Sequence, residues 1–479
     1  MAQYTIPVAE TPMGAVQGLR DGSGELYRAI PYAAAPTGPG RFAPPAPHPG
    51  WSGVRDGTQP SPTAPQPARD FGRLEMTPYF GPGWVRGAEY LTVDIRTPAA
   101  DGRKRPVMVF VHGGGFVTGS TRAALYDGSA FARDGVVVVT VNYRLGIPGF
   151  LDLEGAPANR GLLDVLAALA WVRDTVAVFG GDPDNVTIFG QSAGATIVGA
   201  LLATPEAKGL FRRAIMQSGS GTGAFTPEQA HRVTTAAAAA LGVEPTVEAF
   251  GAITDERFLA ILPALTGLDL RTDNATDPLV GLSPFGLVLP VQPADGLAAG
   301  PAADVDLLIG TNTEEGHLYL VPAGNLESST EADLFAVAAR VYADPEVAIA
   351  ALHAARPGAT PGELRSSVLG HALFEEGTAR MAQAHARISG GRTHLYSFGH
   401  RSTALDGRLG AAHTVELPFV FDIADKPWLH GDTGLLGPGP APAGLATRMH
   451  AAWVAFAETG APGWATYDPL RPAVQIFGS

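Results

Sequence analysis

The stretch Val186-Thr187-Ile188-Phe189-Gly190-Gln191-Ser192-Ala193-Gly194-Ala195 decides how this chain is expected to fold. It starts as a short apolar run typical of a buried strand, passes through a G-x-S-x-G pattern and continues as the apolar helical segment 193–202. A serine at such a strand–turn–helix junction occupies a strained turn that exposes its hydroxyl. Glycines two positions to either side leave room for the neighbouring strand and helix. The stretch therefore predicts a nucleophilic Ser192.

The G-x-S-x-G pattern is weak evidence when taken alone. With 60 glycines and 17 serines in 479 residues, composition yields roughly 0.3 such matches by chance. The alternative is a glycine-flanked helix cap without chemistry. The strand before Gly190 and the apolar helix after Gly194 favour the nucleophile over that alternative.

Short runs rich in valine and isoleucine recur along the chain and are separated by helical patterns. This alternation predicts an α/β fold with a mostly parallel central sheet and helices on both faces. Segments 14–19, 26–30 and 91–95 are expected to be antiparallel N-terminal edge strands, and the alanine-rich region 227–270 to form helical insertions. The predicted parallel strands cover 106–111, 136–142, 186–189, 214–217, 305–310 and 394–398, and the clearest helices cover 161–178, 193–202 and 446–458.

Length and composition indicate a folded globular chain. Hydrophobic residues make up 46% and charged residues 16% of the sequence, which excludes the disordered and fibrous classes. At about 150 residues per domain the chain would have about three domains. Because α/β chains often form longer domains, we expect a single domain over residues 1–479, in which inserted loops and helices form the active-site gorge.

Charge and cysteine content narrow the possible partners. The net charge of −13 repels phosphate backbones and anionic lipids, so neither nucleic acid nor a membrane is an expected partner. The absence of cysteine excludes disulfides, thiolate metal sites and a cysteine nucleophile. The N-terminal segment lacks the basic and apolar regions of a signal peptide, and no stretch approaches the ~20 apolar residues that span a bilayer. We therefore expect a soluble, cytoplasmic protein.

A second glycine-rich motif, His112-Gly113-Gly114-Gly115-Phe116, follows another predicted buried strand. Three glycines allow the backbone to approach a substrate carbonyl and to point N–H groups at the oxygen where negative charge develops. The competing interpretation, a phosphate-binding loop, lacks the required lysine and spacing. Together with the N–H of Ala193, the motif predicts an oxyanion hole.

With these motifs in place, the chain resembles the type-B carboxylesterases, a family that includes the cholinesterases and bacterial p-nitrobenzyl esterases and has the α/β-hydrolase fold. The resemblance covers nearly the whole chain, and the stretch 179–194 fits the serine signature of the family at every constrained position. The other matching stretches are Arg28-Ala29-Ile30-Pro31-Tyr32-Ala33, Val141-Asn142-Tyr143-Arg144-Leu145-Gly146, Ala214-Ile215-Met216-Gln217-Ser218-Gly219-Ser220 and the late helix around Trp453 to Gly460.

The resemblance implies a catalytic triad of serine, glutamate and histidine. The glutamate of the family is the second acid in Gly310-Thr311-Asn312-Thr313-Glu314-Glu315-Gly316, which selects Glu315. The pattern H-x-x-E-x-x-F-V-F begins at His413 and selects it among 12 histidines. Such a set is chemically sensible, because a serine hydroxyl needs a base to remove its proton and the base needs a carboxylate to orient it.

The resemblance also assigns the remaining site residues. The N–H groups of Gly114, Gly115 and Ala193 would hold the oxyanion, and Gln191 and Phe116 would bind substrate. Neither a metal nor an organic cofactor is implied, and the expected partner is a small-molecule ester.

Three departures from the family pattern bear on function. Gln191 replaces the usual glutamate before the serine, which removes a negative charge from the site. Ala88-Glu89-Tyr90-Leu91 stands where the family has E-D-C-L, so Arg41 loses its usual acidic partner. The aromatic residue that binds quaternary ammonium in cholinesterases lies in that same loop and has no secure equivalent. Neutral esters are therefore expected to be preferred over choline-like ones.

The sequence thus predicts a serine hydrolase that cleaves carboxylic esters through an acyl-enzyme. One alternative is an acyltransferase or cyclase, in which a nucleophile other than water resolves the same acyl-enzyme. A second is a non-catalytic, cholinesterase-like binding protein, although such relatives typically lack the serine or the histidine. The sequence predicts neither the natural ester nor the oligomeric state.

Overall fold

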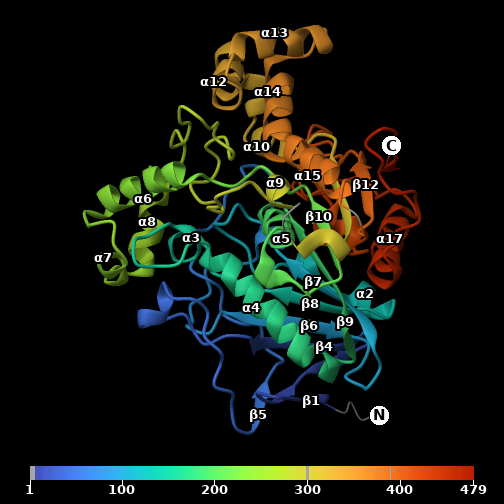
Figure 1. The fold of residues 1–479 in the computed structure, drawn as a ribbon. Coiled ribbons are helices and arrows are strands. Elements are labelled where there is room, and N and C mark those ends of the chain that lie inside the picture. The colour runs from blue at the N-terminus through green and yellow to red at the C-terminus, as the bar shows by residue number, and fades with distance from the viewer. Residues whose placement is uncertain (1–5, 298–300, 389, 479) are drawn as a thin grey trace.

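The protein is built around a ten-stranded sheet, as seen in a computed structural model that describes residues 6–297, 301–388 and 390–478 (Figure 1). The strand order is β13-β12-β11-β10-β9-β7-β8-β6-β4-β3. The strands from β13 to β8 in this order run parallel, and β6, β4 and β3 are added antiparallel at one end. Their bounds are β3 Leu19–Asp21, β4 Gly24–Pro31, β6 Thr92–Thr97, β7 Arg105–Val111, β8 Val137–Val141, β9 Gly181–Gln191, β10 Arg213–Gln217, β11 Asp306–Asn312, β12 Thr393–Phe398 and β13 Val474–Phe477.

The predicted parallel strands are confirmed, because their continuous apolar runs suit strands that are covered on both faces. In the centre of the sheet, Val109 of β7 pairs with Ile188 of β9, and Ile188 pairs with Ala214 of β10. Every residue of β8 and β10 is buried. The α/β-hydrolase class expected from the sequence is thus the architecture observed.

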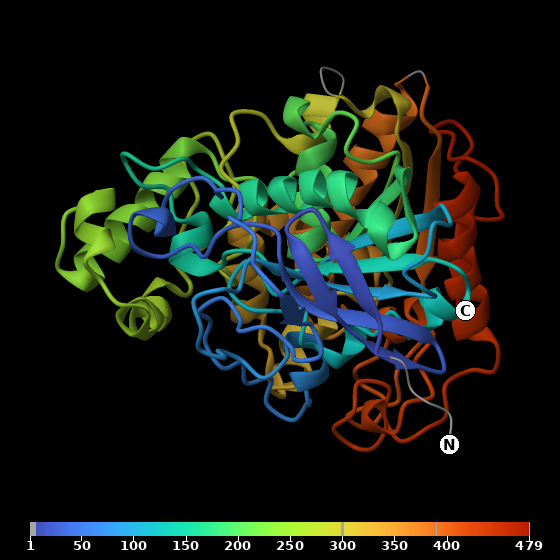
Figure 2. The same ribbon diagram turned by 90° about the horizontal axis from the view of Figure 1, so that it is seen from below.

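The N-terminal strands differ in part from the prediction. Strands β4 and β6 pair antiparallel near one end of the main sheet, as expected. Segment 14–19 is not one edge strand of that sheet. Its first four residues form β2 (Gly14–Gln17), which pairs with β1 (Val8–Thr11) and β5 (Val54–Asp56) in a separate three-stranded sheet at the front of Figure 2, and only Leu19, in β3, belongs to the main sheet. At the other end of the main sheet, β13 was not predicted. It contains no continuous apolar run, and Phe477 is its one buried residue.

Helices cover both faces of the sheet, and the alternation of strand residues separates two cores. On one face, α4 (Arg160–Thr175) and α5 (Ala193–Leu202) share one apolar core with Val107 and Val109 of β7. On the other face, α17 (Leu445–Thr459) packs on Met108 and Phe110 of the same strand through Trp453 and Phe456. The three clearest predicted helices are therefore confirmed.

Two groups of helices extend beyond these layers (Figure 1). The predicted insertion is confirmed as α6, α7 and α8. A second group, α12 to α14, projects at the top of Figure 1, whereas α6 to α8 lie at the left, and it has its own apolar cluster around Leu334, Val368 and Leu369. The remaining helices and these insertions span α1 Thr77–Phe80, α2 Ser129–Arg133, α3 Gly146–Phe150, α6 Pro227–Leu241, α7 Val247–Gly251, α8 Asp255–Leu265, α9 Pro293–Gly296, α10 His317–Leu320, α11 Asn325–Ser328, α12 Glu331–Val341, α13 Pro345–Ala355, α14 Pro361–Gly370, α15 Glu376–Ala386 and α16 Leu417–Val420.

A buried ion pair ties the end of β8 to α4. The Arg144 guanidinium donates to both carboxylate oxygens of Asp164, at 2.8 and 2.7 Å, and both side chains are 0% exposed. Arg144 also donates to the carbonyl of Ala43 at 2.6 Å, which joins the N-terminal segment to the same point. Among the helices of the described residues, none is long and apolar enough to cross a membrane.

Candidate active site

Ser192 stands on a sharp turn between β9 and α5, at the carboxyl edge of the sheet. Its φ of 58° and ψ of −127° are strained for a residue other than glycine. Its N–H donates to the carbonyl of Gln217 on β10 at 2.9 Å, which holds the turn against the next strand. The predicted strand–turn–helix context of Ser192 is therefore confirmed.

The flanking glycines are required by the crowding at this turn. A Cβ on Gly194 would lie 2.0 Å from the carbonyl oxygen of Val111, and a Cβ on Gly190 would lie 2.6 Å from the carbonyl carbon of Gly194. Both distances are far below a van der Waals contact, so no side chain fits at either position. The G-x-S-x-G pattern here reflects this geometry.

His413 and Glu315 form a short, buried hydrogen bond. Glu315 Oε2 lies 2.6 Å from His413 Nδ1, and the two side chains are 0% and 2% exposed respectively. The other carboxylate oxygen accepts from the Ser218 hydroxyl at 2.5 Å and from the Asn312 N–H at 2.7 Å. The carboxylate is thus held from three sides, and its contact with Nδ1 leaves Nε2 as the ring nitrogen that can accept a proton.

The neighbouring Glu314 points elsewhere. Its carboxylate forms an ion pair with Arg401 and accepts from the Ala411 N–H at 2.8 Å. The two adjacent acids therefore have different partners, and the structure brings Glu315 alone of the pair to His413.

The glycine-rich loop after β7 exposes backbone N–H groups. Gly114, Gly115 and Phe116 have φ values of 111°, 63° and 63°, which turn the chain sharply. Among the described residues, the N–H groups of Gly114, Gly115 and Ala193 have no hydrogen-bond acceptor. All three are available to an oxygen of a bound molecule.

These groups meet in one cavity of about 160 Å³. Its lining includes Ser192, Ala193, Gly114, Gly115, Phe116 and His413, and Glu315 reaches it only through His413. The remaining wall is mostly apolar, with Phe71, Phe80, Leu282, Leu318, Leu373 and Phe374. Such a small, apolar cavity with a few convergent polar groups suits a small organic ligand.

Gln191, expected to bind substrate, is fully buried and lies outside the cavity lining. The Tyr79 hydroxyl donates to its Oε1 at 2.6 Å, so its amide nitrogen faces His413 Nε2 at 3.2 Å. Within the described residues, no hydrogen bond joins the Ser192 hydroxyl to His413. Instead, the Gln191 amide N–H points at His413 Nε2, the ring nitrogen that can accept a proton.

A second buried carboxyl group lies beneath the site. Glu416 accepts from the Asn312 side-chain amide at 2.8 Å and from that of Gln217 at 3.3 Å. Burial and, to a smaller extent, the charge of Glu315 raise the pKa of Glu416 to about 7. The Glu315 carboxylate therefore shares its surroundings with an acid that stays largely protonated below neutral pH.

Sequence reasoning missed several residues that shape the site. Phe374 stacks on the His413 ring at 4.2 Å between centroids, and it lies in a π-helical turn, His371–Glu375, at the end of α14. Single π turns often mark functional sites, but no pattern in the sequence signals this one. Ser218 lies in a stretch that matches the family. Nothing in the sequence indicated its positive φ of 50° or its hydrogen bond to Glu315.

Arg41, which lacks the acidic partner usual in the family, pairs with a different acid in the structure. Arg41 forms an ion pair with Asp255 at the start of α8, and its guanidinium lies 4.4 Å over the Phe258 ring. Glu89 pairs instead with Arg55. The loss of the family acid is thus compensated by an acid from the inserted helices.

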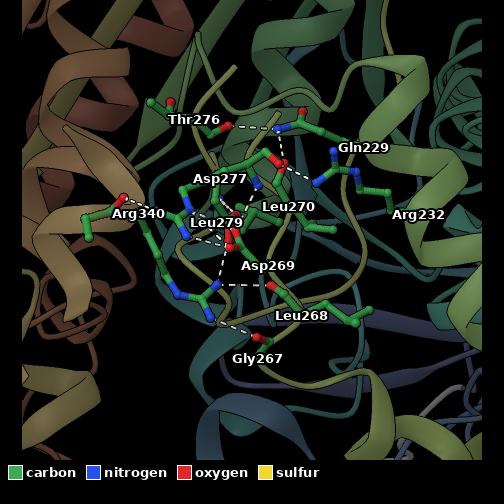
Figure 3. Close-up of polar contacts among 12 residues, drawn as sticks. Gln229, Arg232, Gly267, Leu268, Asp269, Leu270, Thr276, Asp277, Leu279 and Arg340 are labelled. Atoms are coloured by element: carbon green, nitrogen blue, oxygen red, sulfur yellow. Dashed lines mark hydrogen bonds and ion pairs between the residues drawn. The ribbon is translucent and has the colours of Figure 1, made fainter. Parts of the chain in front are cut away.

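The loop before Ser283 forms one wall of the cavity and is clamped from two sides (Figure 3). Asp277, with a fully buried side chain, receives Arg340 Nη1 of α12 at 3.0 Å, and Arg340 also donates to the carbonyls of Gly267 and Leu268. From α6, the Gln229 amide donates to two further loop carbonyls, at 2.8 and 2.7 Å. The inserted helices thereby fix Leu279, Leu282 and Ser283 in the cavity wall.

Comparison with known proteins agrees with this fold and site. The carboxylesterase family profile matches residues 5–474. The chain is 33% identical to phenmedipham hydrolase of Pseudarthrobacter oxydans and 33% identical to para-nitrobenzyl esterase of Bacillus subtilis, covering 99% of this chain and 95% of each relative. A solved structure of the carboxylesterase EST55 of Geobacillus stearothermophilus superposes with a TM-score of 0.83 at 36% identity, covering 98% of this chain and 96% of that one.

These similarities extend over nearly the whole length of the chain and define its class. The chain belongs to the carboxylesterase family. It is a serine hydrolase that acts on carboxylic esters.

Proposed function

We propose that Ser192, His413 and Glu315 are the catalytic triad of this hydrolase. Ser192 Oγ attacks the ester carbonyl while His413 Nε2 accepts its proton, and the imidazolium then protonates the departing alcohol. Water attacks the acyl-enzyme by the same route in reverse. Glu315 holds the ring tautomer and stabilises the imidazolium, which its 2.6 Å contact with Nδ1 supports.

The oxyanion formed in each step would be bound by the N–H groups of Gly114, Gly115 and Ala193. Preorganised donors of this kind typically contribute 10²- to 10³-fold each to the rate. Phe116 would pack against the substrate. Gln191 would act on the substrate indirectly, through His413, because it lies outside the cavity lining.

The observation that carries this proposal is the convergence on one cavity of a strained serine, three N–H groups without acceptors and a histidine held by a buried carboxylate. The test is labelling by a fluorophosphonate followed by mass spectrometry. We expect modification at Ser192, and we expect Ser192→Ala to abolish both labelling and turnover of p-nitrophenyl acetate. Ser220→Ala is the matched control, because Ser220 lines the same cavity. Labelling of Ser220 would contradict the assignment.

The two adjacent glutamates provide a second test of the triad. Glu315→Gln should lower kcat by about 10³- to 10⁴-fold, because the amide favours the wrong tautomer of the ring. Glu314→Gln should lower kcat far less, because Glu314 contacts Arg401 and not His413. Equal losses in the two variants would mean that Glu315 has no special role.

A further inference from the structure

Arg69 is the one charged side chain besides the titratable His413 among the residues that line the cavity. It belongs to the irregular segment between β5 and α1 and is exposed to solvent, which puts it at the cavity mouth. No aspartate or glutamate is part of that lining, and residue 191, beside the nucleophile, is a neutral glutamine. The cavity thus has a positive charge at its entrance with no compensating acid in its described walls.

The Arg69 guanidinium is not paired with an acid in the part of the chain that the structure describes. Within the described residues it makes no hydrogen bond and no ion pair. Protein atoms around it partly desolvate the group and lower its pKa, but an arginine remains protonated at neutral pH. The flanking arginines along the chain are all paired: Arg41 with Asp255, Arg55 with Glu89, Arg73 with Asp406 and Arg86 with Glu256.

The unpaired group lies close to the reaction centre. A Cβ placed on Gly115 would be 3.7 Å from Arg69 Nη2, and the Gly115 N–H is one of the three donors without an acceptor. An ester whose carbonyl oxygen reached those donors would therefore bring its nearby substituents within reach of the guanidinium. Arginine binds carboxylates through two parallel hydrogen bonds, and such pairs are strongest where the group is partly desolvated.

We propose that this site selects esters that carry a carboxylate, and that Arg69 binds that carboxylate. The proposal rests on the function proposed above and extends the expected bias against cationic esters to a preference for anionic over neutral ones. Arg69 is then a specificity-determining residue, because it contacts the substrate without taking part in proton transfer.

The test compares anionic and neutral esters of similar size in the two possible orientations. Mono-p-nitrophenyl glutarate against p-nitrophenyl pentanoate places the charge on the acyl half, and 4-acetoxybenzoate against 4-acetoxybenzamide places it on the alcohol half. Ser192→Ala supplies the background, which matters because a neighbouring carboxylate can attack its own ester. We expect kcat/KM to favour the anionic ester about tenfold in one pair, and the ratio to fall as salt is raised.

Two arginine variants decide whether Arg69 causes the preference. Arg69→Gln should bring the ratio of kcat/KM between the anionic and the neutral ester to about one, whereas Arg69→Lys should retain part of the preference. Arg73→Gln is the matched control, since Arg73 follows closely in the chain, is 64% exposed and lies outside the cavity lining. It should change nothing.

Other outcomes would overturn the proposal. If the wild-type protein favours neither anionic ester, or if Arg69→Gln lowers both members of a pair equally, Arg69 does not recognise a carboxylate. If the neutral esters are hydrolysed normally, the proposed function survives that result. If no ester is turned over and Ser192 is not labelled, the proposed function itself fails, and the substrate preference with it.

Discussion

The contact between Gln191 and His413 links a single residue to the proton-transfer step. The amide N–H of Gln191 faces the unprotonated Nε2, and the Tyr79 hydroxyl keeps the amide in that orientation. A donor at this position stabilises the neutral ring, which is the form that acts as a base. A carboxylate at the same position would accept from the imidazolium and stabilise the charged form instead.

We therefore predict that Gln191→Glu moves the acidic limb of the pH profile of kcat/KM to higher pH. Opposite charges about 4 Å apart are worth about 4 kcal/mol at an effective dielectric of 20, so a shift of at least about one pH unit is expected even after strong screening. The limb reports the free base, and a stabilised imidazolium loses its proton only at higher pH. The measurement is kcat/KM for p-nitrophenyl acetate from pH 5 to pH 9.

Tyr79→Phe is the control for this prediction. It removes the hydroxyl that orients the amide but adds no charge, so the midpoint of the acidic limb should hardly move. An unchanged midpoint in Gln191→Glu, or the same displacement in both variants, would contradict an electrostatic role for residue 191.

At the scale of single elements, the loop that carries Leu279, Leu282 and Ser283 depends on its clamp. Asp277→Asn removes the buried carboxylate that receives Arg340 and the Leu279 N–H (Figure 3). A buried donor that loses its acceptor costs about 1 to 3 kcal/mol. We therefore expect the loop to loosen and KM for p-nitrophenyl esters to rise several-fold. Steady-state kinetics together with limited proteolysis of the loop would measure both effects.

The same loop supplies the control. Asp269 pairs with Arg271, and both side chains are nearly half exposed, so Asp269→Asn should leave KM and the proteolysis rate close to wild type. A similar rise of KM in both variants would show that general loop charge, and not the buried clamp, positions the cavity wall.

At the scale of the whole molecule, the Arg144–Asp164 pair joins the sheet, α4 and the N-terminal segment. Removing one partner of a fully buried pair leaves a stranded charge, which costs about 3 to 5 kcal/mol. We predict that Asp164→Asn lowers the free energy of unfolding by that amount in urea titrations. Asp174→Asn is the matched change at the end of the same helix, where the partners are 50% and 64% exposed, and it should cost less than about 1 kcal/mol. Equal stability of the two variants would contradict this account.

Much of the fold could be predicted from the sequence, because the features that define it lie in short, contiguous segments of the chain. Buried parallel strands are continuous apolar runs, so the centre of the sheet is visible in the letters, as are the glycines that the turn at Ser192 requires. Strand β13 and the separate placement of β2 are not visible, because short, half-exposed strands owe their pairing to tertiary contacts.

The site residues also fall into two groups, those that a local sequence pattern predicts and those that it does not. Ser192 and the glycine loop have local signatures, whereas His413 and Glu315 came from the family resemblance, since no spacing rule connects groups that far apart in the chain. Phe374, Tyr79 and Arg69 could not be predicted, because their roles depend on which distant segments meet at the cavity. Gln191 was expected to bind substrate, but its side chain is buried outside the cavity lining, where it contacts two residues of that lining, Tyr79 and His413.

The projecting helices α12 to α14 have a consequence for how this enzyme can diversify. Their apolar cluster is separate from the two cores of the sheet, yet it includes Leu373 and Phe374, which also line the cavity. A lineage could therefore exchange or remodel this appendage, and with it the range of accepted esters, while the sheet and the turn at Ser192 stay untouched. Directed evolution could follow the same route by recombining this module between homologues instead of mutating the crowded glycines, where no side chain is tolerated.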